Sequence, residues 1–252
     1  MSHLFFFKKT HTPVVYIHVP KCGGTSISHA IRDSQPKSLF GKSRNFKLKP
    51  VKTKRDADAA GKDLFEHREE IFIKELKSKK HDFLTGHTRC VPEVKNEFDH
   101  SYHFVTLLRD PVERWFSNYF YNLHKEDDHF KTNLSLSDYL EAEKLNPINF
   151  NIYTTYFSSP SISAKNHALR VKSACENLAT FKVIGILEDL TSFKESFKKE
   201  LSRDLFIKVS NANKVVNKED RNQQIPDNIR DEVTKLCQHD MKVYEFAKSS
   251  TT

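Results

Sequence analysis

Cysteine is scarce in this sequence, and its four occurrences are scattered. Cys22, Cys90, Cys175 and Cys237 form no C-x-x-C pair, so the zinc sites built on that spacing are excluded. Four cysteines would allow two disulfides, but a chain of 252 residues is not a short, cysteine-dense scaffold. We therefore expect free thiols in a reducing compartment and no metal site.

Long hydrophobic runs are also missing. The N-terminal region has only four apolar residues in a row, from Leu4 to Phe7. That run is too short for a signal peptide and far too short for a membrane span. We expect a cytoplasmic protein without a membrane span; a place in the Golgi lumen would require an anchor outside this sequence.

Acidic residues are outnumbered by basic ones. Lysine and arginine total 41 against 33 aspartates and glutamates, which gives a formal net charge of +8 and a pI near 9.1. This surplus favours an anionic partner, such as nucleotide phosphates, an acidic polysaccharide, nucleic acid or an anionic membrane surface. Hydrophobic residues make up 37% of the chain, including 20 Phe, which is enough material for one large core.

Strand-like and helix-like segments alternate along the chain. Strands are expected at residues 14–19, 82–85, 102–108, 181–187 and 205–209. Helices are expected from Thr25 or Ser26 to residue 32 and at residues 63–80, 110–124, 137–145, 149–157, 164–179 and 192–201, and residues 228–247 are expected to form one or two helices. The alternation predicts an α/β fold with a parallel sheet flanked by helices, in a single domain over residues 1–252. Residues 41–62 are expected to form a basic, flexible loop.

A glycine-rich loop follows the first expected strand, with the sequence Pro20-Lys21-Cys22-Gly23-Gly24-Thr25-Ser26. Inward-facing N–H groups and the positive end of a following helix make an anion site, and a lysine and two hydroxyl groups can reach phosphate oxygens. The lysine precedes the glycines, so the loop differs from the G-x-x-x-x-G-K-[ST] loop of nucleotide triphosphatases. We expect the cysteine to contribute only its backbone.

A second motif follows the strand expected at residues 102–108, with the sequence Arg109-Asp110-Pro111-Val112-Glu113-Arg114-Trp115-Phe116-Ser117. Asp110 is expected to cap a helix. Arg109 would project its planar guanidinium over the edge where parallel sheets bind ligands, and Ser117 could add a hydroxyl group two turns later. We interpret Glu113 and Arg114 as a structural pair.

The two motifs, in this order, resemble the 5′-phosphosulfate and 3′-phosphate motifs of sulfotransferases that use 3′-phosphoadenosine-5′-phosphosulfate (PAPS). The resemblance is to the carbohydrate branch, which includes heparan sulfate 2-O-sulfotransferase and bacterial enzymes; residues 185–190 and 243–246 are similar to later family landmarks. It implies a P-loop-like parallel sheet and sulfuryl transfer from PAPS to a hydroxyl group of an acceptor, expected to be a glycan. It also implies that the 5′-phosphosulfate is bound by Lys21, Cys22, Gly23, Gly24, Thr25 and Ser26, and the 3′-phosphate by Arg109 and Ser117.

The resemblance also points to a catalytic base between the two motifs. Relatives in this branch place a histidine after a short strand there, and His87 occupies that place. An imidazole, with a pKa of about 6.5, can accept a hydroxyl proton at neutral pH. Other branches use a glutamate, so the alternatives on the preceding helix are Glu66, Glu69 and Glu70. The next residues, 88–90, depart from the aromatic residues common in bacterial relatives, which leaves the acceptor type open.

The expected mechanism is in-line displacement at sulfur, without a metal. His87 removes the acceptor proton, and Lys21 stabilises the charge on the leaving nucleotide. His18 is interpreted as a structural residue of the first strand.

Two other function classes fit parts of the sequence. A P-loop nucleotide kinase would need a Walker-type lysine and a magnesium carboxylate, and neither is evident. A basic nucleic-acid-binding module fits the charge, but no recognised motif is present. The seven basic residues within residues 42–55 fit either a solvated loop or a patch that binds a polyanionic acceptor. The sequence leaves the oligomeric state open.

Overall fold

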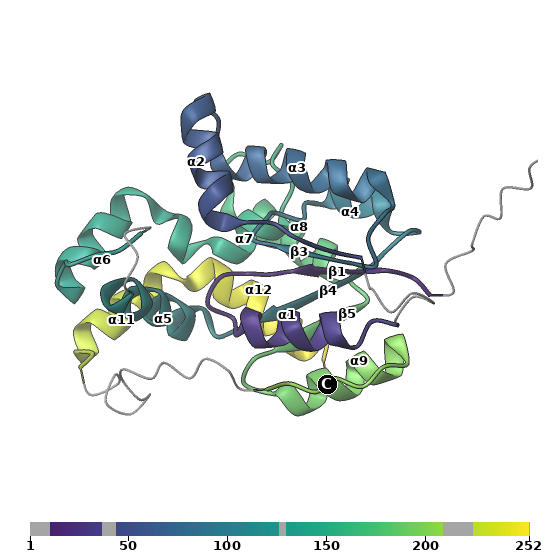
Figure 1. The fold of residues 1–252 in the computed structure, drawn as a ribbon. Coiled ribbons are helices and arrows are strands. Elements are labelled where there is room, and N and C mark those ends of the chain that lie inside the picture. Colours follow the sequence, from purple (N-terminus) through teal and green to yellow (C-terminus); the bar gives the residue numbers. More distant parts are fainter. Residues whose placement is uncertain (1–10, 37–43, 126–129, 209–223, 252) are drawn as a thin grey trace, which may run out of the picture.

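The centre of the molecule is a parallel sheet (Figure 1). The computed structural model describes residues 11–36, 44–125, 130–208 and 224–251. Its strands are β1 (Val14–Ile17), β2 (Asn45–Lys47), β3 (Phe83–Gly86), β4 (His103–Leu108) and β5 (Val183–Ile186). They form one five-stranded sheet in the order β2-β3-β1-β4-β5, and every neighbouring pair is parallel. The expected α/β class with a parallel sheet is confirmed.

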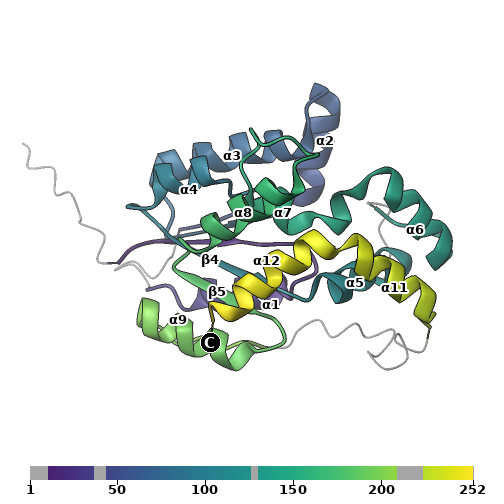
Figure 2. The same ribbon diagram turned by 180° about the vertical axis from the view of Figure 1, so that it is seen from behind.

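Helices cover both faces of the sheet (Figures 1 and 2). Their bounds are α1 (Gly24–Asp33), α2 (Pro50–Ala60), α3 (Leu64–Ser78), α4 (Pro92–Phe98), α5 (Pro111–His124), α6 (Leu136–Leu145), the 3-10 helix η1 (Pro147–Phe150), α7 (Ile152–Phe157), α8 (His167–Leu178), α9 (Leu190–Leu201), α11 (Asp227–Leu236) and α12 (Gln238–Ser249). Within the described ranges, none of these helices combines the length and apolar composition that crossing a bilayer requires.

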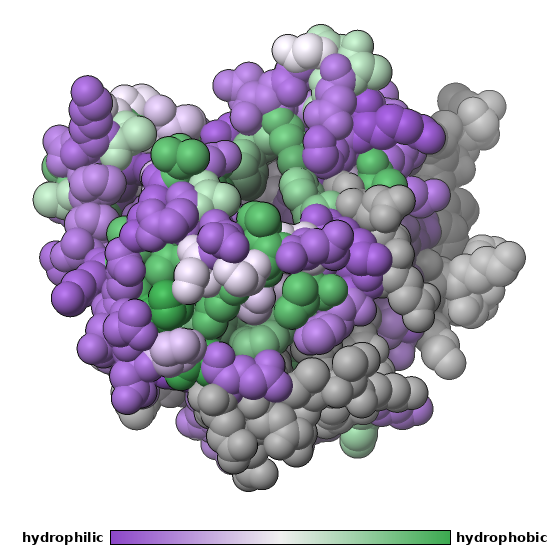
Figure 3. Space-filling view, turned by 90° about the vertical axis from the view of Figure 1, so that its left-hand side faces the viewer, coloured by the Kyte–Doolittle hydropathy of each residue, from purple (hydrophilic) through white to green (hydrophobic). Residues whose placement is uncertain are grey.

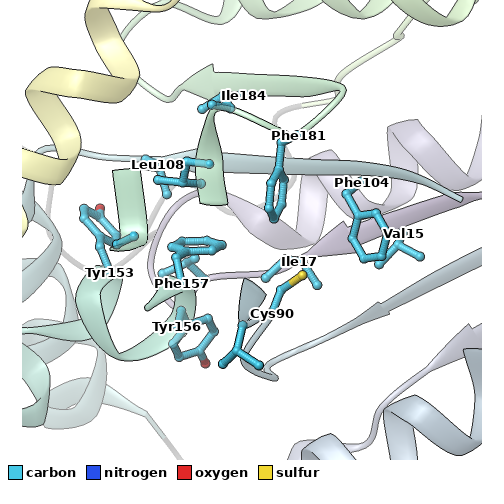
Figure 4. Close-up of a cluster of buried hydrophobic side chains, with 14 of the residues drawn as sticks. Val15, Ile17, Cys90, Phe104, Leu108, Tyr153, Tyr156, Phe157, Phe181 and Ile184 are labelled. Atoms are coloured by element: carbon cyan, nitrogen blue, oxygen red, sulfur yellow. The ribbon is translucent and has the colours of Figure 1, made fainter. Parts of the chain in front are cut away.

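The alternation of side chains along β1 divides the core into two layers. Val15 and Ile17 point into the larger layer, which α3, α4, α7, α8 and α12 cover; Figure 4 shows part of this cluster. Val14 and Tyr16 point to the opposite layer, under α1 and α9. All four side chains are fully buried, because a parallel sheet covered on both faces has no solvent-facing side.

A third apolar cluster lies beside the sheet, on the left in Figure 1, and joins α5, α6, η1 and α11. Trp115 of α5 is its centre: its ring is completely buried and stacks on Phe150 at 5.7 Å between centroids. Asp110 caps α5 as expected, by accepting hydrogen bonds from the N–H groups of Val112 and Glu113. The cluster therefore anchors the helix that carries the second motif.

The expectation of a loop at residues 41–62 is wrong from Asn45 onward, because β2 and α2 occupy this segment. Neither element has a hydrophobic period that the sequence could reveal. β2 forms because its backbone pairs with β3, with Lys47 opposite Thr85. α2 starts at a proline and carries ion pairs four residues apart, from Lys52 to Asp56 and from Lys54 to Asp58. Residues 41–43 of the expected loop lie outside the described residues.

Three smaller expectations also need correction. Residues 205–208 form no strand, and residue 209 lies outside the described part; Leu205 instead packs into the layer under α9. Helix α1 begins at Gly24, with Gly23 at its N-cap in place of Thr25 or Ser26. The helix expected at residues 149–157 is divided between η1 and α7. The one or two helices expected at residues 228–247 are the two helices α11 and α12.

Candidate functional site

The two motifs and His87 meet at one edge of the sheet. The glycine-rich loop of residues 20–26, named the phosphate loop here after the ligand expected from its sequence, follows β1, Arg109 follows β4, and His87 follows β3. Because parallel strands all end at the same edge and β1 lies between β3 and β4, the three segments are neighbours. Figure 3 looks onto this side of the molecule: polar side chains surround apolar ones, and the surface is hollowed between its upper and left-hand lobes.

The phosphate loop has the backbone of an anion-binding turn. Lys21 and Gly23 both have left-handed dihedral angles, with φ of 68° and 70°, which turn the chain sharply before α1. Gly24 packs against the ring of His18: a Cβ atom at Gly24 would lie 1.6 Å from His18 Nε2. Only glycine fits there, and Gly23 at the N-cap offers no side chain to the first N–H groups of α1. Thr25 and Ser26 are partly buried in the same turn.

Cys22 faces the core. Its Sγ lies 3.6 Å from the hydroxyl oxygen of Tyr153 and 3.7 Å from the carbonyl oxygen of Pro20. Burial raises the pKa of this thiol to about 11, against smaller opposing contributions from Arg114, the Tyr153 hydrogen bond and Arg109. The thiol therefore stays protonated at neutral pH and is a poor nucleophile or metal ligand.

Arg109 touches the phosphate loop directly. Its Nη1 donates to the carbonyl oxygen of Lys21 at 3.4 Å, and its Nη2 lies 3.8 Å from Glu113 Oε2. Glu113 also pairs with Arg230 of α11 at 2.9 Å. The expected pair of Glu113 with Arg114 is therefore wrong: Arg114 is buried and donates instead to the carbonyl oxygen of Asn149.

Helix α5 also contacts the loop, through Tyr121. Ser117 is buried on it, at 8% exposure, and Tyr121 lies one turn further along the same face. The Nζ of Lys21 lies 3.5 Å from the centroid of the Tyr121 ring, in a cation–π contact. Lys21 thus contacts Arg109 through its backbone carbonyl and α5 through its ammonium group.

His87 is held in the tautomer that a base needs. Its Nδ1 lies 2.8 Å from the backbone carbonyl oxygen of His18. A carbonyl can only accept, so Nδ1 carries the proton and Nε2 keeps its lone pair. Burial, aided by the charges of Arg68, Lys47 and Lys21 and partly opposed by the His18 hydrogen bond, lowers the pKa of His87 to about 4. The imidazole is therefore neutral at pH 7.

Two of the three alternative carboxylates are engaged in ion pairs. Glu69 pairs with Arg89 at 2.7 Å, and Glu70 pairs with Lys62 at 2.7 Å. Burial raises the pKa of Glu69, whereas the hydrogen bond from Lys62 lowers that of Glu70. Glu66 is exposed in the first turn of α3.

The structure adds a residue that sequence reasoning missed. The hydroxyl group of Tyr153, on α7, accepts from the Arg109 N–H at 3.0 Å and donates to the Arg109 carbonyl oxygen. The same hydroxyl contacts Cys22, so one buried side chain joins both motifs. Asp240 of α12 fixes α7 by accepting from the N–H groups of Tyr153 and Thr154 at 2.7 and 3.0 Å. No local sequence pattern marks Tyr153 or Asp240 as part of a site.

No group of three or more potential metal-ligating side chains comes together within the described ranges. The sequence matches one family, described as the sulfotransferase family, over residues 3–247. A comparison with curated proteins finds no match.

Proposed function

Because the chain belongs to the sulfotransferase family and is therefore an enzyme of sulfuryl transfer, we propose that its donor is PAPS. In this proposal Lys21, Cys22, Gly23, Gly24, Thr25 and Ser26 bind the 5′-phosphosulfate, and Arg109 and Ser117 bind the 3′-phosphate. The observation that carries it is the direct contact between the motifs, from Arg109 Nη1 to the Lys21 carbonyl. A ligand with phosphate groups at two positions can bridge such a pair.

In the proposed reaction His87 is the base. Its Nε2 takes the proton from the acceptor hydroxyl while that oxygen attacks sulfur in line. A new S–O bond forms, the S–O bond to the 5′-phosphate breaks, and the bridging oxygen leaves with its electron pair. Lys21 and the N–H groups at the start of α1 stabilise the negative charge that develops on that oxygen. The neutral state of His87 and the engagement of Glu69 and Glu70 in ion pairs support this assignment over the glutamates.

For the acceptor, we propose an anionic glycan. Lys47 and Lys49 are exposed at the end of β2, next to the strand that leads to His87. Tyr121 and Phe130 are 44% and 56% exposed, and lysine ammonium groups lie near their rings. Exposed aromatic rings beside cations suit a sugar that carries negative groups. We place the reaction in the cytoplasm, in keeping with four cysteines that are all free.

Nucleotide binding tests the donor assignment. Saturating 3′-phosphoadenosine-5′-phosphate should raise the melting temperature, and 5′-AMP at the same concentration should raise it much less, because only the former has a 3′-phosphate for Arg109. Transfer of label from PAPS to a panel of hydroxylated glycans then tests the reaction. Equal shifts from the two nucleotides would contradict the 3′-phosphate site. A larger shift with ATP and magnesium, or with DNA, would favour a kinase-like enzyme or a nucleic-acid-binding module.

A further inference from the structure

His18 lies between the phosphate loop and His87. On one side, its ring centroid is 4.1 Å from that of His87, with the planes inclined at 40°, and its carbonyl oxygen holds His87 Nδ1 at 2.8 Å. On the other side, its Nε2 occupies the space where any side chain at residue 24 would lie. One residue therefore contacts the proposed base twice and the loop once.

These contacts restrict different motions of the base. The carbonyl group selects the tautomer of His87, and the ring limits rotation of the imidazole about its χ angles. The ring contacts both His87 and Gly24, so it helps to fix the distance between the base and the start of α1. That distance matters because the attacking oxygen and the sulfur must meet in line, and a displacement of about 1 Å can reduce a rate by about 10²-fold.

His18 is also suited to this place by its charge. Burial is the main cause that lowers the pKa of His18 well below its usual value, and His87, Lys47 and Lys21 add to it. The groups that face His87 from other elements are Arg68 on α3, Lys47 on β2 and Lys21 in the loop. A neutral ring can stay beside His87 when it gains a proton, whereas a second cation would repel it.

We propose that His18 is a positioning residue that holds the His87 imidazole at a fixed orientation and distance from the phosphate loop. This inference rests on the proposed function, in which His87 is the base. It replaces the interpretation of His18 as a purely structural residue of the strand expected at residues 14–19.

A double-mutant cycle tests the inference in the whole chain. His18→Ala should lower kcat about tenfold to 10²-fold and leave the Kd for 3′-phosphoadenosine-5′-phosphate within about twofold. In a His87→Ala background, His18→Ala should lower kcat little further, because a positioning residue acts only through its partner. His103→Ala is the matched control: this partly buried histidine begins β4 at the opposite end of the sheet, and its loss should leave kcat nearly unchanged. An equal loss in both backgrounds would overturn the proposal.

A second measurement does not depend on sulfuryl transfer. NMR titration of His87 should show a proton on Nδ1 and a low pKa, and His18→Ala should raise that pKa toward its usual value because water replaces the ring. An unchanged His87 titration in the variant would overturn the proposal even if activity falls. If the wild-type protein transfers no sulfuryl group, the proposed function fails while this titration still reports the coupling. Should His18→Ala fail to fold, His18→Gln, which keeps a planar polar group, is measured in the same two ways.

Discussion

At the residue scale, Lys47 combines an exposed position with an effect on the proposed base. Lys47 is the last residue of β2 and pairs with Thr85, which precedes His87 by two residues. Its positive charge helps to lower the pKa of His87. A protonated imidazole cannot accept a proton, so activity requires a pH above the pKa of the base. With that pKa at about 4 in the free protein, kcat/KM for the donor should stay level from pH 8 to pH 6 and fall only at more acidic pH.

Lys47→Gln should move this acidic limb to higher pH. Removing a positive charge makes it easier to protonate His87, so the pKa rises and activity is lost earlier on acidification. The shift should be at most about one pH unit, since Lys47 is exposed and solvent screens its charge. Lys49→Gln is the control, because it removes an equal charge two residues further along the chain. Identical profiles for the two variants, or no shift with Lys47→Gln, would contradict the assignment of His87 as the base.

At the element scale, α7 carries the contact that joins the two motifs. The helix has only six residues, and Asp240 of α12 binds the N–H groups of its first turn. Burial raises the pKa of Asp240 to about 6, while the two N–H groups and Arg114 act in the opposite direction. The C-terminal helix thus sets the position of Tyr153, and Tyr153 sets the backbone of Arg109.

Tyr153→Phe should weaken both stability and nucleotide binding. The change leaves the Arg109 N–H and carbonyl groups without their partner, which costs about 1–3 kcal/mol for a buried polar group. Urea unfolding should show the lower free energy of unfolding, and calorimetry should show weaker binding of 3′-phosphoadenosine-5′-phosphate.

Tyr156→Phe provides the matched comparison for this prediction. Tyr156 is equally buried in α7, but its hydroxyl group takes no part in the contacts to Arg109. The Tyr156→Phe variant should bind 3′-phosphoadenosine-5′-phosphate as tightly as the wild type does. Equal losses in the two variants would show that Tyr153 only fills space.

Helix α2 is the element that local sequence patterns conceal most completely. Its lysines and aspartates pair at i and i+4, which stabilises a helix without producing a hydrophobic face. Arg68 of α3, which is buried, donates to the Thr53 hydroxyl and the Pro50 carbonyl of α2 and also to the His87 carbonyl. The basic segment is therefore attached to the proposed base through one guanidinium.

At the scale of the whole molecule, the net charge of +8 predicts a salt-dependent encounter with a polyanionic acceptor. KM for such an acceptor should rise with ionic strength, and a neutral acceptor should show no such rise. Lys47 and Lys49 should contribute most, because Lys52 and Lys54 are already paired with Asp56 and Asp58 on the same helix.

Two double variants separate these contributions. Lys47→Gln with Lys49→Gln should flatten the dependence of KM on salt and leave kcat at saturation nearly unchanged. Lys52→Gln with Lys54→Gln removes the same formal charge and should change the slope less. If KM depends on salt equally in both variants and the wild type, residues 47–54 take no part in acceptor binding.

The fold class could be predicted from the sequence because its signals are local. The buried strands are short β-branched and aromatic runs, and Asp110 with Pro111 marks the start of α5, so β1, β4, β5 and α5 were all expected. The loop at residues 20–26 and Arg109 were recognised from motif and order alone. β2 forms by backbone pairing with β3, and α2 is stabilised by ion pairs. Neither has a hydrophobic pattern, so local sequence patterns did not predict them.

The sequence by itself thus determined the buried strands β1, β3, β4 and β5, the place where the glycines allow a turn, and that a glycine-rich loop and an arginine each follow a strand. The tertiary structure alone decided that β1 lies between β3 and β4, which brings the loop, His87 and Arg109 to one edge. It also decided that Tyr153 and His18 connect them, since these contacts join residues up to 131 positions apart. Side chains so distant in the chain leave no periodic trace in it, because their proximity arises only when the helices pack on the sheet.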